Sequence, residues 1–453
     1  MHREITQGSI IRSLTLLSWP VVVAMALHTS YSLVDIFWVG KLGATPVAAV
    51  SLAAVAFYII LAVAQTLGAG TIALVARAYG AKDYFKAAHV VRQSLALTTL
   101  VALGISAVGV FLSRNFVALL GGEGEVLVLG SQYLRIAFIG FFFHLLGFNI
   151  NYAFRGTGDM VTPMFIMLVA TGLNMILDPL LILGVSFFPR LGVQGAALAT
   201  LIAKFFGFLI ACGFLVRGRA GLKLHLRERF RLGGSVVRTL LSIGLPVGVS
   251  YGLMTLSWMA IFRSVARFGP QAQAALGIGV RVLQLAGLPV VGIGIATTTM
   301  VGQNLGARRP DRAEQAAHEA IAFSTLIMAL AGVLFFFQAE GLIRIFSSDE
   351  AVIAEGIRLL RIASLHLVFV GLSMTIAGVF RGSGDTKPPM YAGLIKLVLL
   401  VYMASLLSGS PAMGIKGVWW AIVISYGVES FILALWFRRG TWKEKRIEIL
   451  NSH

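Results

Sequence analysis

Twelve apolar segments, each long enough to cross a lipid bilayer, set the strongest constraint on what this chain can form. A membrane-spanning helix needs about 20 mostly apolar residues, because its rise must cover the hydrocarbon core. Only 12% of the 453 residues are charged, too few for a soluble surface of this size. We therefore expect an all-α integral membrane protein with twelve transmembrane helices. The expected spans are residues 12–40, 46–78, 89–113, 127–154, 161–187, 193–216, 236–267, 271–304, 314–338, 353–380, 388–409 and 413–437.

The distribution of basic residues predicts the orientation of these helices. The net charge of +18 does not indicate a nucleic-acid partner, because the basic residues lie in short clusters between apolar segments. They are frequent near both termini, after even-numbered segments and between the sixth and seventh, and basic loops remain in the cytoplasm. We expect a multi-pass protein of the cell (inner) membrane, surrounded by lipids, with both termini cytoplasmic. The first segment has no obvious small-residue cleavage site, so we expect a retained helix rather than a signal peptide.

The two halves of the sequence are repeats of one another. Adding 226 to a residue number carries Pro20 onto Pro246, and Phe-Arg-Gly-Thr-Gly-Asp at 154–159 onto Phe-Arg-Gly-Ser-Gly-Asp at 380–385. Near the end of each half the shift becomes 222. Each half holds six segments, so both enter the membrane with the same polarity. This predicts two parallel six-helix repeats around a central cleft.

The repeat also predicts the domain organisation. We expect an N-terminal lobe at 1–217, a cytoplasmic linker at 218–235 and a C-terminal lobe with a short basic tail at 236–453. Two similar bundles around a cleft favour alternating access over a continuous pore. Because one chain encloses its own cleft, we expect a monomer.

Three acidic side chains lie well inside the expected spans, namely Asp35, Asp178 and Glu429. A charge inside the membrane is costly and needs compensation, so it points to function. The related positions in the other half are apolar or small, which argues against a role in shared architecture; they are Ile261, Ala404 and Gly207. Two of the acids fall in the N-terminal half, where we expect the site that couples transport to an ion.

Helical spacing gathers further polar groups around these two acids, because residues three and seven positions apart share a helix face. The groups are His28, Tyr31 and Asp35 in the first segment, Thr171, Asn174 and Asp178 in the fifth, His144 and Asn151 in the fourth, and Thr200 in the sixth. Carboxylate, amide and hydroxyl oxygens suit a small hard cation, and either carboxyl could instead carry a proton. A sodium ion would have as ligands Asp35, Asn174, Asp178 and Thr200. We expect no cofactor other than the transported proton or sodium ion. The alternative interpretation of these residues is a polar network that only holds the bundle together.

Prolines add candidate moving parts. Pro179 leaves the carbonyl of Met175 without its helical donor, and Pro20 does the same to Leu16. Such a carbonyl can bind an ion or mark a hinge. The residues that we expect in the substrate cavity or in gating are Tyr31, His28, Pro20, Met175 and Glu429.

These residues make the chain similar to the multidrug and toxic compound extrusion family of secondary transporters, from Ile11 to about Phe437. The motifs that carry the resemblance are Ser18-Trp19-Pro20, the run from Tyr31 to Gly40, the two Arg-Gly-x-Gly-Asp segments, and the run from Leu173 to Pro179. The resemblance implies twelve helices in two lobes, and efflux of cationic or amphipathic drugs driven by sodium ions or protons.

Within that family the chain resembles the DinF-like branch, whose coupling site lies in the N-terminal lobe. The matching positions are Asp35, Asn151, Asn174, Asp178 and Thr200. The NorM-like branch adds acids to spans 7 and 10. Here span 7 has none, and span 10 has only Glu355 near its start.

The expected function is a cation-coupled antiporter that exports organic cations or amphipathic drugs. The chief alternative is a flippase of lipids or lipid-linked oligosaccharides from the same superfamily, which would need a cationic cleft. The central basic residues are only Lys204, Arg281 and Lys396, of which Lys204 could neutralise an acid and the others could pair with Glu429. An enzyme is not expected, because the chain shows no nucleophile or metal motif, and a channel is not expected from two fused bundles with buried acids.

Overall fold

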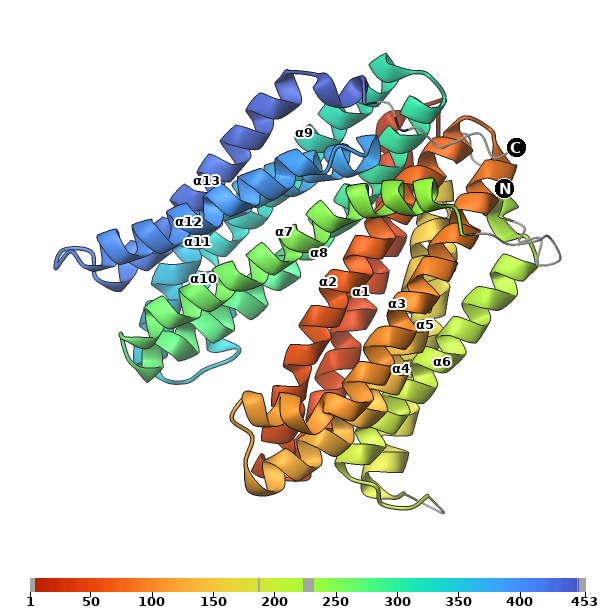
Figure 1. Cartoon of the computed structure of the whole chain (residues 1–453). Coiled ribbons are helices and arrows are strands. Elements are labelled where there is room, and N and C mark those ends of the chain that lie inside the picture. Colours follow the sequence, from red (N-terminus) through yellow and green to blue (C-terminus); the bar gives the residue numbers. More distant parts are fainter. Residues whose placement is uncertain (1–4, 186–187, 223–231, 446, 448–453) are drawn as a thin grey trace. The chain divides into compact units, whose positions relative to one another are not determined.

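The computed structural model describes residues 5–185, 188–222, 232–445 and 447, and this part of the chain is helical and contains no strand (Figure 1). Twelve of its helices are long and apolar enough to cross a membrane, and only the short α10 is not. The predicted all-α fold with twelve spans is therefore confirmed. The α-helices are α1 (Ile10–Gly40), α2 (Ala44–Gly80), α3 (Tyr84–Leu119), α4 (Gly124–Thr157), α5 (Val161–Leu183), α6 (Val193–Val216), α7 (Gly234–Ala266), α8 (Pro270–Gly306), α9 (Pro310–Phe337), α10 (Ala339–Arg344), α11 (Glu350–Ser383), α12 (Lys387–Ser408) and α13 (Ile415–Arg438), with 3-10 turns η1 (Arg219–Gly221) and η2 (Thr441–Lys443).

Some helices begin or end at other residues than expected, because capping residues set these ends. α3 begins five residues before the expected 89, because the side chain of Asp83 accepts a hydrogen bond from the backbone nitrogen of Lys86 at 2.9 Å and caps the helix. α5 ends before the expected 187, because Gly184 adopts the left-handed conformation with φ 71°. Hydropathy marks the apolar length of a helix, whereas capping residues mark its end.

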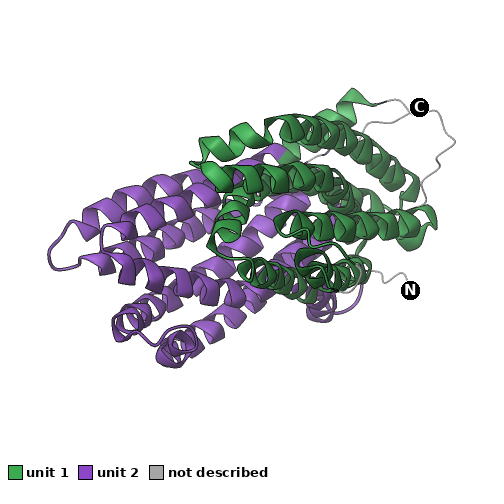
Figure 2. Ribbon diagram, turned by 90° about the horizontal axis from the view of Figure 1, so that it is seen from below, with its two compact units in different colours: residues 1–2, 23–244, 448–453 green, residues 3–22, 245–447 purple. Residues whose placement is uncertain are grey.

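The helices form two compact units, which Figure 2 shows in green and purple. Among the described residues, unit 1 comprises Val23–Gly244, and unit 2 comprises the residues up to Val22 together with Leu245–Ile447. The expected lobes 1–217 and 236–453 differ from these units in two stretches. The first part of α1 belongs to unit 2, and the first part of α7 belongs to unit 1. Of the expected linker, residues 223–231 lie outside the described part of the chain.

The two exchanged stretches contact their host units through glycines. In unit 1, a Cβ on Gly70 of α2 would lie 2.5 Å from the carbonyl oxygen of Leu240 in α7. In unit 2, a Cβ on Gly292 of α8 would lie 2.9 Å from the carbonyl oxygen of Ser18 in α1. Glycine is therefore required at both contacts, because any side chain would displace the backbone opposite it.

The repeated Arg-Gly-x-Gly-Asp segments have the same structural role in both units. A Cβ on Gly156 would lie 2.9 Å from Val75 Cβ, and one on Gly382 would lie 3.1 Å from Val301 Cβ. The second glycine of each segment ends its helix in the left-handed conformation, with φ 91° at residue 158 and 81° at residue 384. These segments let α4 pack closely against α2, and α11 against α8.

Candidate functional site

A row of buried oxygens lies along α5 in unit 1. Asp178 and Asn174 are both 0% exposed, and Asn174 Nδ2 donates a hydrogen bond to Asp178 Oδ1 at 3.1 Å. Thr171 is buried in the turn before them. Pro179 lies inside the helix, so the carbonyl of Met175 lacks its usual amide donor. α5 thus carries side-chain and backbone oxygens over about two turns.

α1 and α6 bring three more oxygen-bearing side chains to α5. The hydroxyl groups of Tyr31 and Thr200 are 2.6 Å apart and share a hydrogen bond. Asp35, one turn after Tyr31, is 9% exposed and lies within electrostatic range of both Asp178 and Tyr31. Four of the five predicted coupling residues, Asp35, Asn174, Asp178 and Thr200, therefore meet with Tyr31 in one unit, each on the helix that the sequence assigned to it.

The hydrogen bonding of this group is incomplete. Four buried acceptor oxygens have no hydrogen-bond partner, and they are Asp35 Oδ1, Thr171 Oγ1, Asn174 Oδ1 and Asp178 Oδ2. Buried polar atoms are nearly always paired, so unpaired acceptors in a group indicate a ligand or water. Oxygens from carboxylate, amide and hydroxyl groups are the ligands of hard cations. In the described residues, no three His, Cys, Asp or Glu side chains could hold a metal ion, so a sodium ion would also depend on the amide and hydroxyl oxygens.

An apolar layer covers one end of the oxygen group. Val39, Ile182 and Ala196 are buried and pack together, with Tyr133 partly buried against them. Each of the three lies one helical turn from a polar residue of the group, on α1, α5 and α6 respectively. Moving an ion through an apolar layer costs much free energy, because the ion has no oxygen ligands there. The layer therefore separates the oxygen group from the loop ends of these helices.

Lys204 and two histidines lie beside the acids. The ammonium of Lys204 is 5.3 Å from the ring centroid of Phe57 and 5.2 Å from that of Phe141. Lys204 is within electrostatic range of Asp35, His28 and His144, and His28 stacks on Phe57 at 6.3 Å. The neighbourhood of the acids is therefore aromatic and contains one lysine side chain.

Several predicted residues make no hydrogen bond to this group. Asn151 on α4, in the same unit, is half-buried, and its side-chain oxygen is also a buried acceptor without a partner. Pro20 belongs to unit 2 although it shares α1 with Asp35. Glu429 lies in unit 2 and pairs with Lys396, with Glu429 Oε1 3.0 Å from the ammonium.

Sequence reasoning missed Tyr133 and Asn149, both on α4. Tyr133 interacts electrostatically with Asp35 and Asp178. Asn149 is buried, and its side-chain nitrogen donates to Ser94 and Thr98, both at 2.9 Å. A tyrosine in an apolar helix gives no special signal, whereas the hydroxyl residues of α3 and the amide of α4 could have been paired as a network.

Both a protein family and individual relatives match most of this chain. The MatE family model matches twice, over residues 20–180 and 246–407, and the two matches begin 226 residues apart (246 − 20), at Pro20 and Pro246. The probable multidrug resistance protein YoeA of Bacillus subtilis is 29% identical over 446 residues, which cover 98% of this chain and 96% of that protein.

Two solved structures show the same fold. A MOP superfamily transporter from Pyrococcus furiosus, in which a reversed polarity of the binding pocket suggests a different function, aligns with a TM-score of 0.90 at 28% identity over 98% of each chain. An outward-facing multidrug resistance MATE family transporter of the same superfamily aligns with a TM-score of 0.91 at 27% identity, over 98% of this chain and 99% of the other. The chain therefore belongs to the MatE family, the multidrug and toxic compound extrusion transporters that its sequence motifs resemble.

Proposed function

We propose that the chain is an antiporter that exports organic cations or amphipathic drugs in exchange for protons or sodium ions by alternating access. The observation that carries this proposal is the group of unpaired buried oxygens around Asp35 and Asp178. An acid that binds an incoming ion is neutralised and no longer attracts a cationic substrate, so ion and drug occupy the site in turn. Nothing in this scheme requires a resident cofactor or a catalytic step.

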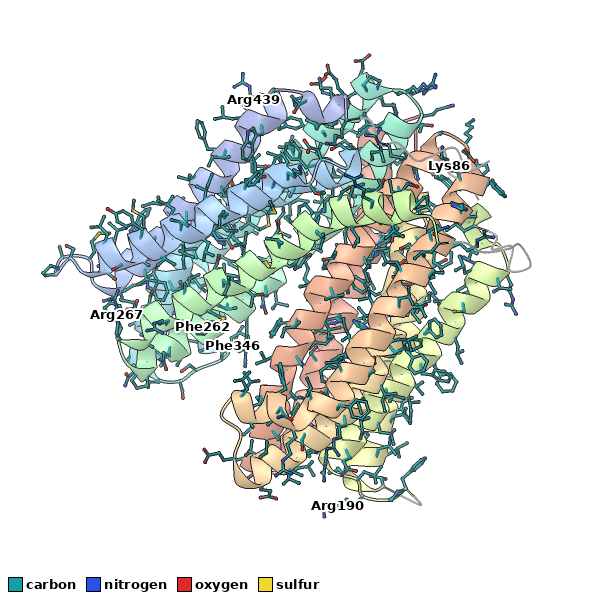
Figure 3. The ribbon with its side chains drawn as sticks, in the orientation of Figure 1. Lys86, Arg190, Phe262, Arg267, Phe346 and Arg439 are labelled. Carbon is teal, nitrogen blue, oxygen red and sulfur yellow. The ribbon has the colours of Figure 1, made fainter. Side chains whose placement is uncertain are left out.

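The proposed orientation places both termini in the cytoplasm of a cell whose inner membrane holds the protein. Figure 3 shows Lys86 and Arg190 at opposite ends of unit 1. Lys86 lies in the first turn of α3, just after Lys82 in the preceding loop, whereas Arg190 lies in a loop with few basic residues. The positive-inside rule therefore assigns the Lys86 end to the cytoplasm. The apolar layer at Val39, Ile182 and Ala196 then lies on the outer side of the oxygen group.

The polarity of unit 1 supports a cationic or amphipathic substrate. Asp35 and Asp178 outnumber the single ammonium of Lys204, and the rings of Phe57 and Phe141 offer apolar contact. A flippase for pyrophosphate-linked lipids would need an excess of positive charge instead. We therefore do not carry that alternative forward, and we propose that the transporter works as a monomer.

The test is ethidium efflux from proteoliposomes under an imposed proton gradient or sodium gradient. We expect efflux to follow one gradient, and expect Asp35→Asn and Asp178→Asn each to abolish the dependence on it. The exposed loop acid Glu123 provides the control Glu123→Gln, which should behave as the unmodified protein. Full coupling in both aspartate variants would show that the oxygen group is only structural.

A further inference from the structure

A second group of charged and polar side chains lies inside unit 2, near the middle of three helices. Lys396 of α12 and Glu429 of α13 are buried, and the Lys396 ammonium is 3.0 Å from Glu429 Oε1. The same ammonium lies 4.3 Å from the ring centroid of Tyr426, one turn before Glu429. One ammonium is therefore held by a carboxylate and an aromatic face at once.

His366 of α11 completes the group. Its ring lies edge-on to Tyr426 with centroids 4.2 Å apart, it interacts electrostatically with Lys396, and it is 5% exposed. Neither ring nitrogen has a hydrogen-bond partner. A neutral imidazole always offers one acceptor nitrogen, and an ammonium has three donors to place.

The repeat shows that this group is not part of the shared fold. With a shift of 226 Lys396 corresponds to Ala170, and with a shift of 222 Glu429 corresponds to Gly207. In unit 1 these positions also touch, since a Cβ on Gly207 would lie 3.4 Å from Ala170 Cβ. The fold is therefore satisfied by small apolar residues at this contact in unit 1, whereas unit 2 has a pair of opposite charges there.

The surroundings of the Lys396 ammonium resemble a binding site for an organic ammonium ion. A carboxylate, an aromatic face and an open acceptor are the groups that recognise an organic ammonium ion. Here the ammonium comes from the chain itself, on a lysine stem that packs inside the bundle. Removing charges from water inside a membrane protein is costly, so a pair that the fold does not need points to a role in recognition.

We propose that Glu429, Tyr426 and His366 form a binding site for a primary ammonium group, and that Lys396 occupies this site and closes it to external cations. Unit 2 thus contains a cation site that is already filled, whereas the oxygen group of unit 1 is left for exchange. This inference does not depend on the proposed drug export, because it concerns binding within unit 2.

The experiment is ligand rescue of the purified full-length chain in detergent. Lys396→Ala removes three carbons and the ammonium, which together match n-propylammonium. We expect Lys396→Ala to unfold at a lower temperature than the unmodified protein, and n-propylammonium to restore most of the loss. The uncharged 1-propanol should restore little, and sodium chloride should restore none. The unmodified protein should show no shift with the amine, because Lys396 fills the site.

The controls separate recognition from simple packing. In Lys396→Ala/Glu429→Gln the amine should no longer raise the unfolding temperature. Rescue by 1-propanol equal to that by the amine, or amine rescue that persists without Glu429, would overturn the proposal. Lys396→Met keeps an apolar stem and removes only the ammonium, so if Lys396→Ala does not fold, the same contrast applies to this variant with ammonium chloride against sodium chloride. Absence of any amine effect in the folded variant would also overturn it.

Discussion

At the scale of single residues, the two acids of unit 1 have different surroundings. One oxygen of Asp178 accepts a hydrogen bond from Asn174 and the other is unpaired, whereas Asp35 is slightly exposed and interacts electrostatically with Lys204. Tyr31 and Thr200 do not touch the acids through a hydrogen bond but fix each other. The two acids would therefore supply the negative charge that a bound cation needs. The hydrogen bond between the two hydroxyl groups would hold the side chains around the cation in place.

The first prediction concerns the pair of hydroxyl groups. Tyr31→Phe removes the hydrogen bond of 2.6 Å to Thr200 and frees the threonine side chain. A hydrogen bond of this kind contributes about 1 kcal/mol, so the ion concentration for half-maximal efflux should rise roughly five-fold. Tyr58→Phe is the matched control, because Tyr58 is 59% exposed on α2. An equal effect of both variants would mean that the hydroxyl pair does not position the site.

The second prediction concerns the positive charge beside Asp35. Lys204→Met keeps the apolar stem and removes the ammonium that competes with an incoming cation. The half-saturating ion concentration should fall, by roughly three- to ten-fold for the loss of one nearby charge. Lys41→Met is the control, since the Lys41 ammonium also lies over an aromatic ring, at 4.2 Å from Trp38, but on an exposed residue. An unchanged or higher value in Lys204→Met would contradict the prediction.

The acids of this site could be found from the sequence because a charge inside an apolar helix is conspicuous. Helical spacing then placed Asn174 beside Asp178 correctly, since both are on one helix. The contact of Lys204 with Phe57 and Phe141 could not be found in this way, because it joins three helices through space. The same limit applies to Glu429, for which the sequence offered two basic partners and the structure shows Lys396.

At the scale of helices, close approach decides which glycines matter. Gly156 and Gly382 sit where one helix crosses another, and a side chain would meet the backbone or β-carbons of the neighbour. The sequence showed both glycines through the repeat, but it could not tell a tight turn from a close crossing. In the structure the motif has both roles. Its first glycine allows the close crossing, and its second glycine ends the helix.

The third prediction concerns this crossing. Gly382→Ala should lower the unfolding temperature, because the new Cβ would lie 3.1 Å from Val301 Cβ and from the carbonyl carbon of Thr298. Overpacking of this kind costs about 1–3 kcal/mol. Gly213→Ala is the control, since this glycine lies inside α6 with no atom within 4 Å of the added Cβ. It should be neutral or slightly stabilising, because alanine favours the helix. Equal stability of the two variants would show that the neighbours of Gly382 can yield.

At the scale of the whole molecule, the two units exchange the beginnings of their first helices. The repeat predicts two contiguous halves, but α1 passes from unit 2 to unit 1 after Val22, and α7 passes from unit 1 to unit 2 after Gly244. Hydropathy cannot reveal this exchange, because each helix is one continuous apolar segment. Each passage lies within three residues of a helix-interior proline, Pro20 in α1 and Pro246 in α7.

The last prediction follows from these two passages. Alternating access requires the units to move as bodies, and α1 and α7 must then deform where they pass from one unit to the other. Pro20 and Pro246 weaken the helices at those points, since each leaves a carbonyl without its donor at a cost of about 3 kcal/mol. Pro20→Ala and Pro246→Ala restore the missing hydrogen bond, so each should raise the unfolding temperature and slow ethidium efflux. The ion concentration for half-maximal efflux should stay unchanged, because Asp35 and Asp178 are untouched. Pro289→Ala is the matched control, as Pro289 also lies inside a helix, α8, but well within unit 2. It should stabilise the protein without slowing transport, and slowing by all three variants alike would mean that general helix stiffness, and not the passage between units, limits turnover.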